Sequence, residues 1–320
     1  MSTKQHMTTV SLVLGSGGAR GLAHIGVIKW LEHNGYKIES VAGSSMGALI
    51  GGMYAAGQLD IYANWVMALE KKDVIRLLDI SFARKSLFKG NRIIEVLREM
   101  IGDYEIQDLP ISYTAVATDM ESQEEVWLNR GSLFDAIRAS IAIPTIFSPH
   151  HYMNKTFLDG SLVNPIPIAP TLQDKTDITI AVSLSGKVQP PTVLKPHIED
   201  EININGRNIN GYHKIITQFI NGLQKNNPSS AKKEITLYEI IAKSMDTMQS
   251  KIARLQLAAY SPNVIVAIPS NACSFYEFYR ARELIEIGYQ KAEEQLSEFT
   301  SPPSSSPNRN STEHELISEI

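Results

Sequence analysis

The chain has 320 residues, of which 43% are hydrophobic and 20% charged, a composition typical of a globular protein with a large core. Its formal net charge of −4, without a basic stripe, argues against nucleic acid as a partner. Cys273 is the only cysteine, so a disulfide within the chain and a cysteine-based zinc site are both excluded.

The apolar stretches are short. Residues 10–14 form an apolar run near the N-terminus, but glycines interrupt it before it reaches the length of a signal-peptide core. No stretch approaches the roughly 18 apolar residues of a membrane span. We therefore expect a cytoplasmic protein, with peripheral membrane contact left open.

The first sixty residues alternate between strand and helix patterns. Residues 8–14 and 37–43 are apolar and rich in β-branched side chains, as buried strands are, and helical patterns follow each of them. This order predicts parallel strands joined by helical crossovers, hence an α/β fold. Farther along, the sequence predicts strands over 111–118, 124–129, 178–184 and 263–269, and helices over 92–102, 131–140 and 277–298.

We expect one α/β domain over residues 8–299, preceded by a flexible N-terminus over 1–7. Between 186 and 233 the composition shifts to Pro, Asn, Lys and Ser, which predicts a mobile surface insertion with one short helix around 212–223. The low-complexity segment 300–320 is expected to be a disordered tail.

A long helix follows the expected insertion. Six of its apolar residues recur every three or four positions and so form one seam: Ile241, Met245, Met248, Ile252, Leu255 and Ala259. We interpret this seam as a face that packs against the sheet; a dimer or partner helix is the alternative.

Two glycine-rich turns follow the first two strands, and the earlier one raises the question of a bound nucleotide. Gly15 and Gly17 fit a dinucleotide-binding loop, and Glu39 lies near the position of its acidic residue. However, Arg20 occupies the place that must be small for the helix to approach the strand. A P-loop is excluded because no Gly-Lys-Ser/Thr follows.

The second turn matches a nucleophile elbow. Gly43-Ser44-Ser45-Met46-Gly47 is a complete Gly-x-Ser-x-Gly between a predicted strand and a predicted helix, which is the context that such an elbow requires. Ser45 is therefore the candidate nucleophile. Gly43 and Gly47 are small because the turn leaves no room for side chains on either side of the serine.

A serine nucleophile needs a base, and the histidines are poor candidates for it. We interpret His24 as a helix residue with a structural hydrogen bond, and the later histidines as solvated surface residues: His150, His151, His197, His213 and His314. Asp159 lies at the end of a short apolar run, directly before Gly160 on a sharp turn. With an elbow present and no usable histidine, Asp159 is the better candidate.

Four ordered blocks give the chain a family resemblance. It resembles the patatin-like phospholipases, in particular their bacterial branch, in "GSGGARGLAHIGV", "AGSSMGALIGGMYA", "DAIRASIAIPTIFSP" and "FLDGSLVNPIPI". The similarity covers about residues 8–185 and resumes after the expected insertion. It implies a single patatin-like α/β/α domain with a mostly parallel sheet.

The resemblance also implies roles for residues. In the family a Ser-Asp dyad does the work of a triad, which implies Ser45 as nucleophile and Asp159 as proton acceptor. The amides of Gly17, Gly18 and Ala19 would form the oxyanion hole. Arg20 would hold this loop or bind an anionic group of the substrate.

Two positions depart from the family pattern. Ser16 replaces the first glycine of the usual Gly-Gly-Gly-x-Arg-Gly, and Ser161 takes the third place of the usual Asp-Gly-Gly or Asp-Gly-Ala. Neither change removes a reacting group.

The expected activity is hydrolysis of fatty-acyl esters of lipids, without a cofactor or metal. We expect residues 141–149 and the methionine-bearing long helix to line an acyl-chain groove, with core packing as the alternative. A non-catalytic regulatory or partner-binding protein on the same fold, a nucleotide-binding protein and a serine hydrolase of other acyl substrates remain alternatives. The sequence does not determine the oligomeric state.

Overall fold

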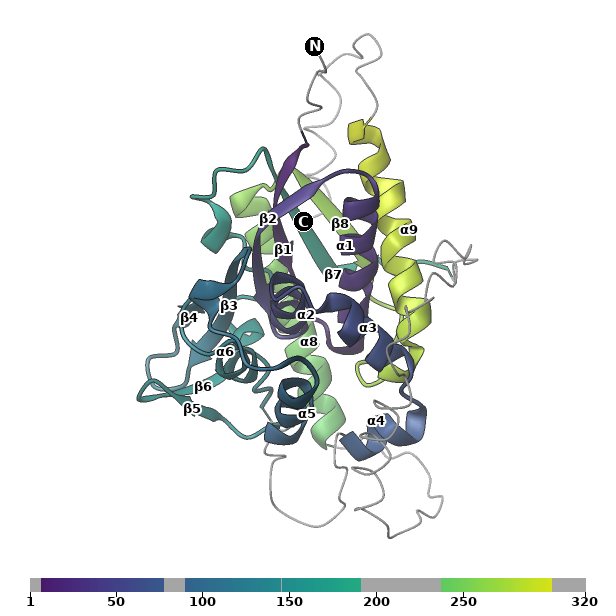
Figure 1. Cartoon of the computed structure of the whole chain (residues 1–320). Helices are drawn as coiled ribbons and strands as arrows, with labels where there is room; N and C mark the ends of the chain where they lie inside the picture. The colour runs from purple at the N-terminus through teal and green to yellow at the C-terminus, as the bar shows by residue number, and fades with distance from the viewer. Residues whose placement is uncertain (1–6, 78–89, 145, 191–236, 301–320) are drawn as a thin grey trace, which may run out of the picture.

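A mostly parallel sheet organises the computed structural model, which describes residues 7–77, 90–144, 146–190 and 237–300 (Figure 1). The strand order is β5-β6-β3-β2-β1-β7-β8, with β4 paired to β3 beside this path. The strands are β1 (Thr9–Leu14), β2 (Lys37–Ser44), β3 (Ser112–Asp119), β4 (Glu125–Leu128), β5 (His150–Tyr152), β6 (Lys155–Asp159), β7 (Ile178–Gly186) and β8 (Val264–Pro269). Strands β3, β2, β1, β7 and β8 run parallel, while β4, β5 and β6 add antiparallel pairs at one side.

Helices cover both faces of this sheet, so the predicted α/β/α architecture is confirmed. The α-helices are α1 (Ala23–His33), α2 (Met46–Ala55), α3 (Leu59–Met67), α4 (Lys71–Leu77), α5 (Asn91–Ile101), α6 (Leu133–Ser140), α8 (Leu237–Tyr260) and α9 (Ala281–Thr300). Two short 3-10 helices belong to the candidate site: η1 (Gly18–Leu22) and η3 (Gly160–Leu162).

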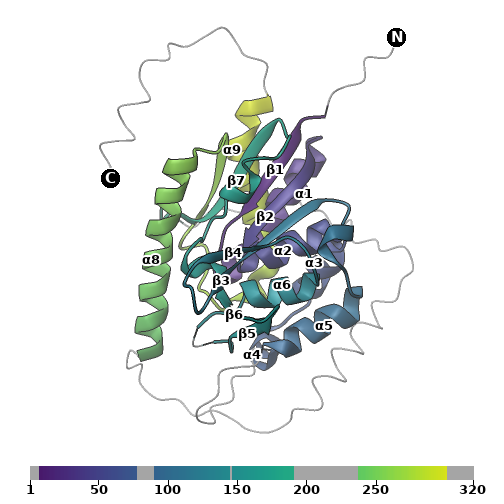
Figure 2. The ribbon, with the colours of Figure 1, turned by 90° about the vertical axis from the view of Figure 1, so that its left-hand side faces the viewer.

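The direction of the chain explains which helix covers which face. From β1 to β2 to β3 the chain moves one way across the sheet, whereas from β7 to β8 it moves the other way. Because parallel crossovers are right-handed, helices that join strands in opposite directions lie on opposite faces. Accordingly, α8 stands alone on one side of the sheet, with α1, α2 and α6 on the other (Figure 2).

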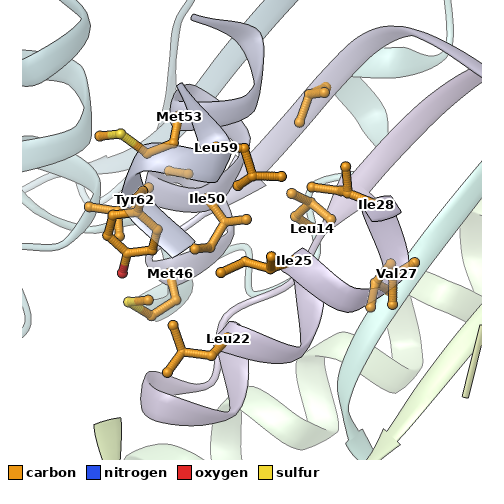
Figure 3. Packing of buried hydrophobic residues seen from close by; sticks show 14 of the residues in the cluster. Leu14, Leu22, Ile25, Val27, Ile28, Met46, Ile50, Met53, Leu59 and Tyr62 are labelled. Atoms are coloured by element: carbon orange, nitrogen blue, oxygen red, sulfur yellow. The ribbon is translucent and has the colours of Figure 1, made fainter. Parts of the chain in front are cut away.

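The two faces bury very different amounts of apolar side chain. On the α1 and α2 face, Leu14 of β1 packs with Ile25 and Ile28 of α1 and with Ile50 of α2 in one large cluster (Figure 3). On the α8 face, the cluster consists of Val13, Ile166, Ile168, Ala181 and Ala253, with Leu257 against it. The larger cluster holds the ends of β1 and β2 in place.

The prediction that the apolar seam of the long helix packs against the sheet is wrong, because none of its six residues is buried and three of them are exposed. Met248 and Leu255 are 56% and 69% exposed, and Ala253 is the one buried side chain among those described for α8. The helix turns a different side to the sheet because the facing strands present small residues, Val13 and Ala181, and because polar contacts on that side favour it.

Elements expected from the sequence otherwise match closely, with ends shifted by a few residues. Ser132 caps α6 as its spacing to Asp135 predicts, since its Oγ accepts a hydrogen bond from the Asp135 amide at 3.2 Å. The sequence analysis does not predict helices α3 and α4, nor the short strand β5 that contains His150 and His151. Among the described residues, no helix combines the length and apolar character needed to cross a bilayer.

Several predictions lie outside the described residues. These are the flexible N-terminus as far as residue 6, the insertion from 191 to 233 with its short helix, and the tail from 301 to 320.

Candidate active site

The Gly-x-Ser-x-Gly sequence forms a tight turn between β2 and α2. Ser45 has φ 55° and ψ −121°, a conformation that costs an L-residue energy and is characteristic of functional turns. A Cβ on Gly47 would overlap the backbone of Leu14, so the helix can approach β1 only with glycine there. The amide of Ser45 donates to Ser140 Oγ at 2.9 Å, which fixes the turn from the side of α6.

Asp159 ends β6 and meets Ser45. The Ser45 hydroxyl donates to Asp159 Oδ2 at 2.7 Å, and the two residues are 4% and 1% exposed. The backbone of Asp159 is held on both sides, by its amide to the Ala142 carbonyl at 3.0 Å and by the Thr118 hydroxyl to its carbonyl at 2.8 Å. The structure thus brings together the two residues predicted as nucleophile and base.

The second carboxylate oxygen of Asp159 is also satisfied. Oδ1 accepts from the Ser161 amide at 2.8 Å and from the Ser161 hydroxyl at 2.6 Å. Burial raises the pKa of the Asp159 carboxyl to about 6, against the opposing effect of the hydrogen bonds from Ser161 and Ser45. Ser161, one of the two departures from the family pattern, is therefore a direct partner of the candidate base.

The glycine loop after β1 lies beside the elbow and offers backbone donors. The amides of Gly17 and Gly18 have no hydrogen-bond partner among the described residues, and Gly18 and Ser45 line the same cavity. Gly18 has φ +56° and lies against the Phe275 ring, which leaves no room for a side chain.

Ala19 does not fit the oxyanion role implied for it. Its amide already donates to the Phe275 carbonyl at 2.9 Å, so it is not free to bind a developing charge. This leaves Gly17 and Gly18 as the loop amides available for that role.

Arg20 is turned into the protein. Its guanidinium donates to the carbonyl of Gly17 at 3.3 Å, to the carbonyl of Ser270 at 2.7 Å and to Asp246 Oδ1 at 2.6 Å. Its side chain is 8% exposed. Of the two roles considered for Arg20, these contacts favour holding the loop over binding an anionic substrate group.

Ser16 fits its place in the loop without strain. Its φ is not positive, so the position does not require glycine, and its amide donates to the Pro165 carbonyl at 2.8 Å. This departure from the family pattern leaves the loop conformation intact.

The histidines with described positions have other partners than Ser45. The imidazole of His24 lies 2.8 Å from the Gly15 carbonyl through Nε2, and complete burial lowers its pKa to about 4. His150 pairs with Asp135 at 3.0 Å, and His151 contacts Thr156 at 2.9 Å. His197, His213 and His314 lie outside the described residues.

An apolar cavity opens at Ser45. From the predicted segment 141–149 it is lined by Ile141, Ile143, Ile146 and Phe147, as expected. The expected contribution of the long helix is absent among the described lining residues. Its other walls come from Gly18 and Ser45, from the start of α2, from α3 to α5 and from the segment before α9: Met46, Leu49, Tyr62, Trp65, Val66, Leu69, Val74, Ile93, Phe275, Tyr276 and Phe278.

Some of these residues follow a helical spacing in the sequence that the predicted elements do not include. Leu59, Tyr62 and Val66 follow at intervals of three and four positions, the spacing of an amphipathic helix, and Tyr62, Trp65 and Val66 of this helix, α3, form one wall of the cavity. Ser140, Asp246 and Gln249 carry no comparable signal, because their importance depends on contacts with residues far away in the chain.

The nucleotide alternative conflicts with the strand register. Lys37 of β2 pairs with Thr9, and Gly43 pairs with Leu14. Glu39 therefore lies near the amino end of β2, whereas the glycine loop follows the carboxyl end of β1. It could not reach a ribose held at that loop. Within the described ranges, no three His, Cys, Asp or Glu side chains gather where they could hold a metal ion.

Comparisons with known proteins agree with the resemblance seen in the sequence. The family model described as patatin-like phospholipase matches residues 12–172. An "uncharacterized NTE family protein" of Mycobacterium tuberculosis is 35% identical over 91% of this chain and 92% of its own length. Lysophospholipase NTE1 of Kluyveromyces lactis is 28% identical over 88% of this chain, which corresponds to 18% of that protein.

Among solved structures, VipD from Legionella pneumophila aligns over 91% of this chain and 67% of its own. The TM-score is 0.39 and the sequence identity 13%, too distant a match to support an argument.

Proposed function

The chain belongs to the patatin-like phospholipase family, and we propose that it is a serine hydrolase that cleaves fatty-acyl esters of lipids through Ser45 and Asp159. One observation carries the proposal: the 2.7 Å hydrogen bond from Ser45 Oγ to Asp159 Oδ2, at a serine that lines an apolar cavity. Family membership supports lipid hydrolysis in general, and this geometry supports the particular dyad.

The proposed reaction has two halves. Asp159 Oδ2 takes the proton as Ser45 Oγ attacks the acyl carbonyl, and the amides of Gly17 and Gly18 stabilise the oxyanion. Collapse of the tetrahedral intermediate expels the alcohol, which takes the proton from Asp159. Water then attacks the acyl-serine, again with Asp159 as base, and releases the fatty acid and free Ser45.

The environment of Asp159 suits a base. An ordinary carboxyl, with a pKa of about 4, is a weak acceptor for a serine proton. Burial raises the pKa of Asp159 to about 6, which increases its basicity while leaving it mostly ionised at neutral pH. We therefore expect kcat/KM to fall as the pH drops below about 6, since the protonated carboxyl cannot accept a proton.

The cavity supports an acyl chain as the group bound beside Ser45. Its walls are aliphatic and aromatic side chains, such as Ile143, Phe147 and Trp65, which favour a hydrocarbon over a polar ligand. One relative is named a lysophospholipase. We therefore propose phospholipids and lysophospholipids as the first substrate classes to test. Peripheral contact with a membrane stays a prediction.

The test is fatty-acid release from a panel of phosphatidylcholine, lysophosphatidylcholine, monoacylglycerol and palmitoyl-coenzyme A. It is run beside Ser45→Ala and Asp159→Asn. We expect release from at least one ester class, with a loss of about a thousandfold or more in both variants. Full activity in Asp159→Asn would show that the dyad is wrong, and release from the thioester alone would redirect the proposal to other acyl substrates.

The alternative is a regulatory or partner-binding protein that keeps the fold without the chemistry. No observation in the described residues favours it, because the elbow, the carboxylate and the cavity are all in place. Absence of fatty-acid release from every substrate, together with no reaction of Ser45 with a fluorophosphonate, would favour this alternative.

A further inference from the structure

Helix α8 makes two polar contacts with the candidate site, three residues apart. Asp246 Oδ1 accepts from Arg20 Nη2 at 2.6 Å, and Gln249 Nε2 donates to Ser161 Oγ at 2.9 Å. Residues three apart lie on one side of a helix, and here that side faces the sheet. The same helix thus contacts a residue of the glycine loop and the partner of the candidate base.

The contact made by Gln249 continues to the nucleophile. Gln249 donates to Ser161, Ser161 Oγ donates to Asp159 Oδ1 at 2.6 Å, and Asp159 Oδ2 accepts from Ser45 at 2.7 Å. A serine hydroxyl has one proton to donate. Because Gln249 supplies a donor to this oxygen, the proton of Ser161 stays directed at the carboxylate.

The contact made by Asp246 continues to the proposed oxyanion loop. Asp246 holds Nη2 of Arg20, while Nε of the same guanidinium donates to the Gly17 carbonyl at 3.3 Å. Nη1 binds the Ser270 carbonyl at 2.7 Å, at the end of β8. A planar guanidinium held at several points restrains the loop residue that it contacts.

We propose that α8 positions both halves of the catalytic site, the carboxylate through Gln249 and Ser161, and the glycine loop through Asp246 and Arg20. This inference rests on the proposed function. Gln249, Ser161 and Asp246 are positioning residues, since they act on the reacting groups through other side chains. The aspartate motif with serine in third place is what makes the link from α8 to the base possible.

The packing of α8 is consistent with this role. Apolar burial contributes little to its docking, because Ala253 is its one buried side chain among those described and Leu255 is 69% exposed. The polar contacts therefore contribute to fixing which side of the helix faces the site, together with the small apolar cluster around Ala253.

The two contacts predict different effects. Among the described residues, burial and the hydrogen bonds from Ser45 and Ser161 account for the pKa of Asp159, without a charged neighbour. Weakening the Ser161 bond through Gln249 should therefore raise the pKa of Asp159. Releasing Arg20 should instead slow turnover without raising that pKa.

The experiment compares Gln249→Met, Ser161→Ala and Asp246→Asn in the full chain, with Lys251→Ala as control. Lys251 is exposed on α8. Hydrolysis of p-nitrophenyl butyrate is followed against pH, and the Asp159 carboxyl is titrated by 13C NMR with Asp159→Asn for assignment. If Gln249→Met does not fold, Ser161→Ala tests the same hydrogen bond, because it removes the acceptor of the Gln249 amide.

We expect Gln249→Met to move the Asp159 titration and the acid limb of kcat/KM upward by roughly half a pH unit, and Ser161→Ala by roughly one. Asp246→Asn should lower kcat roughly tenfold, with little change in KM and no upward shift. If either Gln249→Met or Asp246→Asn behaves like Lys251→Ala, the proposal is overturned.

The outcome is separable from that of the proposed function. If the wild-type chain and Ser45→Ala hydrolyse the ester equally, the proposed function fails. The NMR titration still decides the inference in that case, because it reads the Asp159 carboxyl directly: an unmoved titration in Gln249→Met overturns it.

Discussion

The two glycine-rich turns of the site are built in different ways. The elbow owes its shape mainly to close backbone approaches that only glycine allows, of Gly43 to Gly47 and of Gly47 to Leu14, with one further contact from Ser140. The loop after β1 owes its shape to distant residues. Apart from the contact of Arg20 with the Gly17 carbonyl inside the loop, its amides and the Arg20 side chain bind partners that come later than residue 160: Pro165, Val182, Asp246, Ser270 and Phe275.

This difference predicts that the elbow matters mainly for folding and the loop mainly for the rate of the reaction. The elbow presents the nucleophile wherever strand and helix pack correctly, so it is tied to the stability of the fold. We expect that the loop can be loosened through the contacts of Arg20 while the fold is kept. Substitutions in the elbow should therefore affect folding, and substitutions around the loop should affect turnover.

The largest expected effect removes the base while leaving both turns intact. Asp159→Asn should lower kcat/KM by at least about a thousandfold, because the amide cannot accept the proton of Ser45. Hydrolysis of p-nitrophenyl butyrate measures it, with Asp174→Asn as a control outside the site. A loss no greater than that of the control would remove Asp159 from the mechanism.

The same substitution should stabilise the fold at neutral pH. The carboxyl pKa is raised in the folded state, so the folded chain binds a proton more readily than the unfolded chain, and stability falls as the pH rises between about 4 and 6. Asp159→Asn should gain up to roughly 3 kcal/mol at pH 7.5 and little at pH 4. Urea unfolding at both pH values tests the sign.

Next in size is a substitution that breaks the elbow. Gly47→Ala places a methyl group against the Leu14 backbone, which cannot move without displacing β1, and should cost about 3 kcal/mol or more. Gly57→Ala is the matched control, because open space surrounds it and only its φ of +68° is strained, at about 1 kcal/mol. Equal losses of stability in the two variants would mean that the elbow accommodates a side chain at position 47.

The corresponding change near the loop should affect turnover instead. Arg20→Met removes the three hydrogen bonds of the guanidinium and should slow turnover about tenfold to a hundredfold, with a smaller loss of stability than Gly47→Ala. Lys29→Met, which breaks the ion pair between Lys29 of α1 and the exposed Asp60 of α3, is the control. If Arg20→Met unfolds the protein and Lys29→Met does not, the contrast between the turns is lost.

The smallest expected effect concerns the cavity at which the turns meet. Ile143→Trp should narrow it and reduce hydrolysis of long-chain relative to short-chain p-nitrophenyl esters by about tenfold, leaving the reactivity of Ser45 unchanged. Ile143→Leu keeps the volume and serves as control. An unchanged chain-length profile would place the acyl chain elsewhere.

The same contrast explains what could be predicted from sequence. The alternation of strands and helices and the elbow depend on local patterns, and both are found in the structure. The orientation of α8 depends on its polar contacts through Asp246 and Gln249 and on the facing residues Val13 and Ala181, none of which its apolar seam records. The use of the Ala19 amide by Phe275 likewise depends on a contact that no local pattern records.

The central claim, that Ser45 is a nucleophile activated by Asp159, is tested most directly by the site and rate of fluorophosphonate labelling, located by peptide mass spectrometry. We predict a single adduct on Ser45, absent in Ser45→Ala and formed at least about a hundredfold more slowly in Asp159→Asn. An adduct on another residue, or an unchanged rate in Asp159→Asn, would contradict the account.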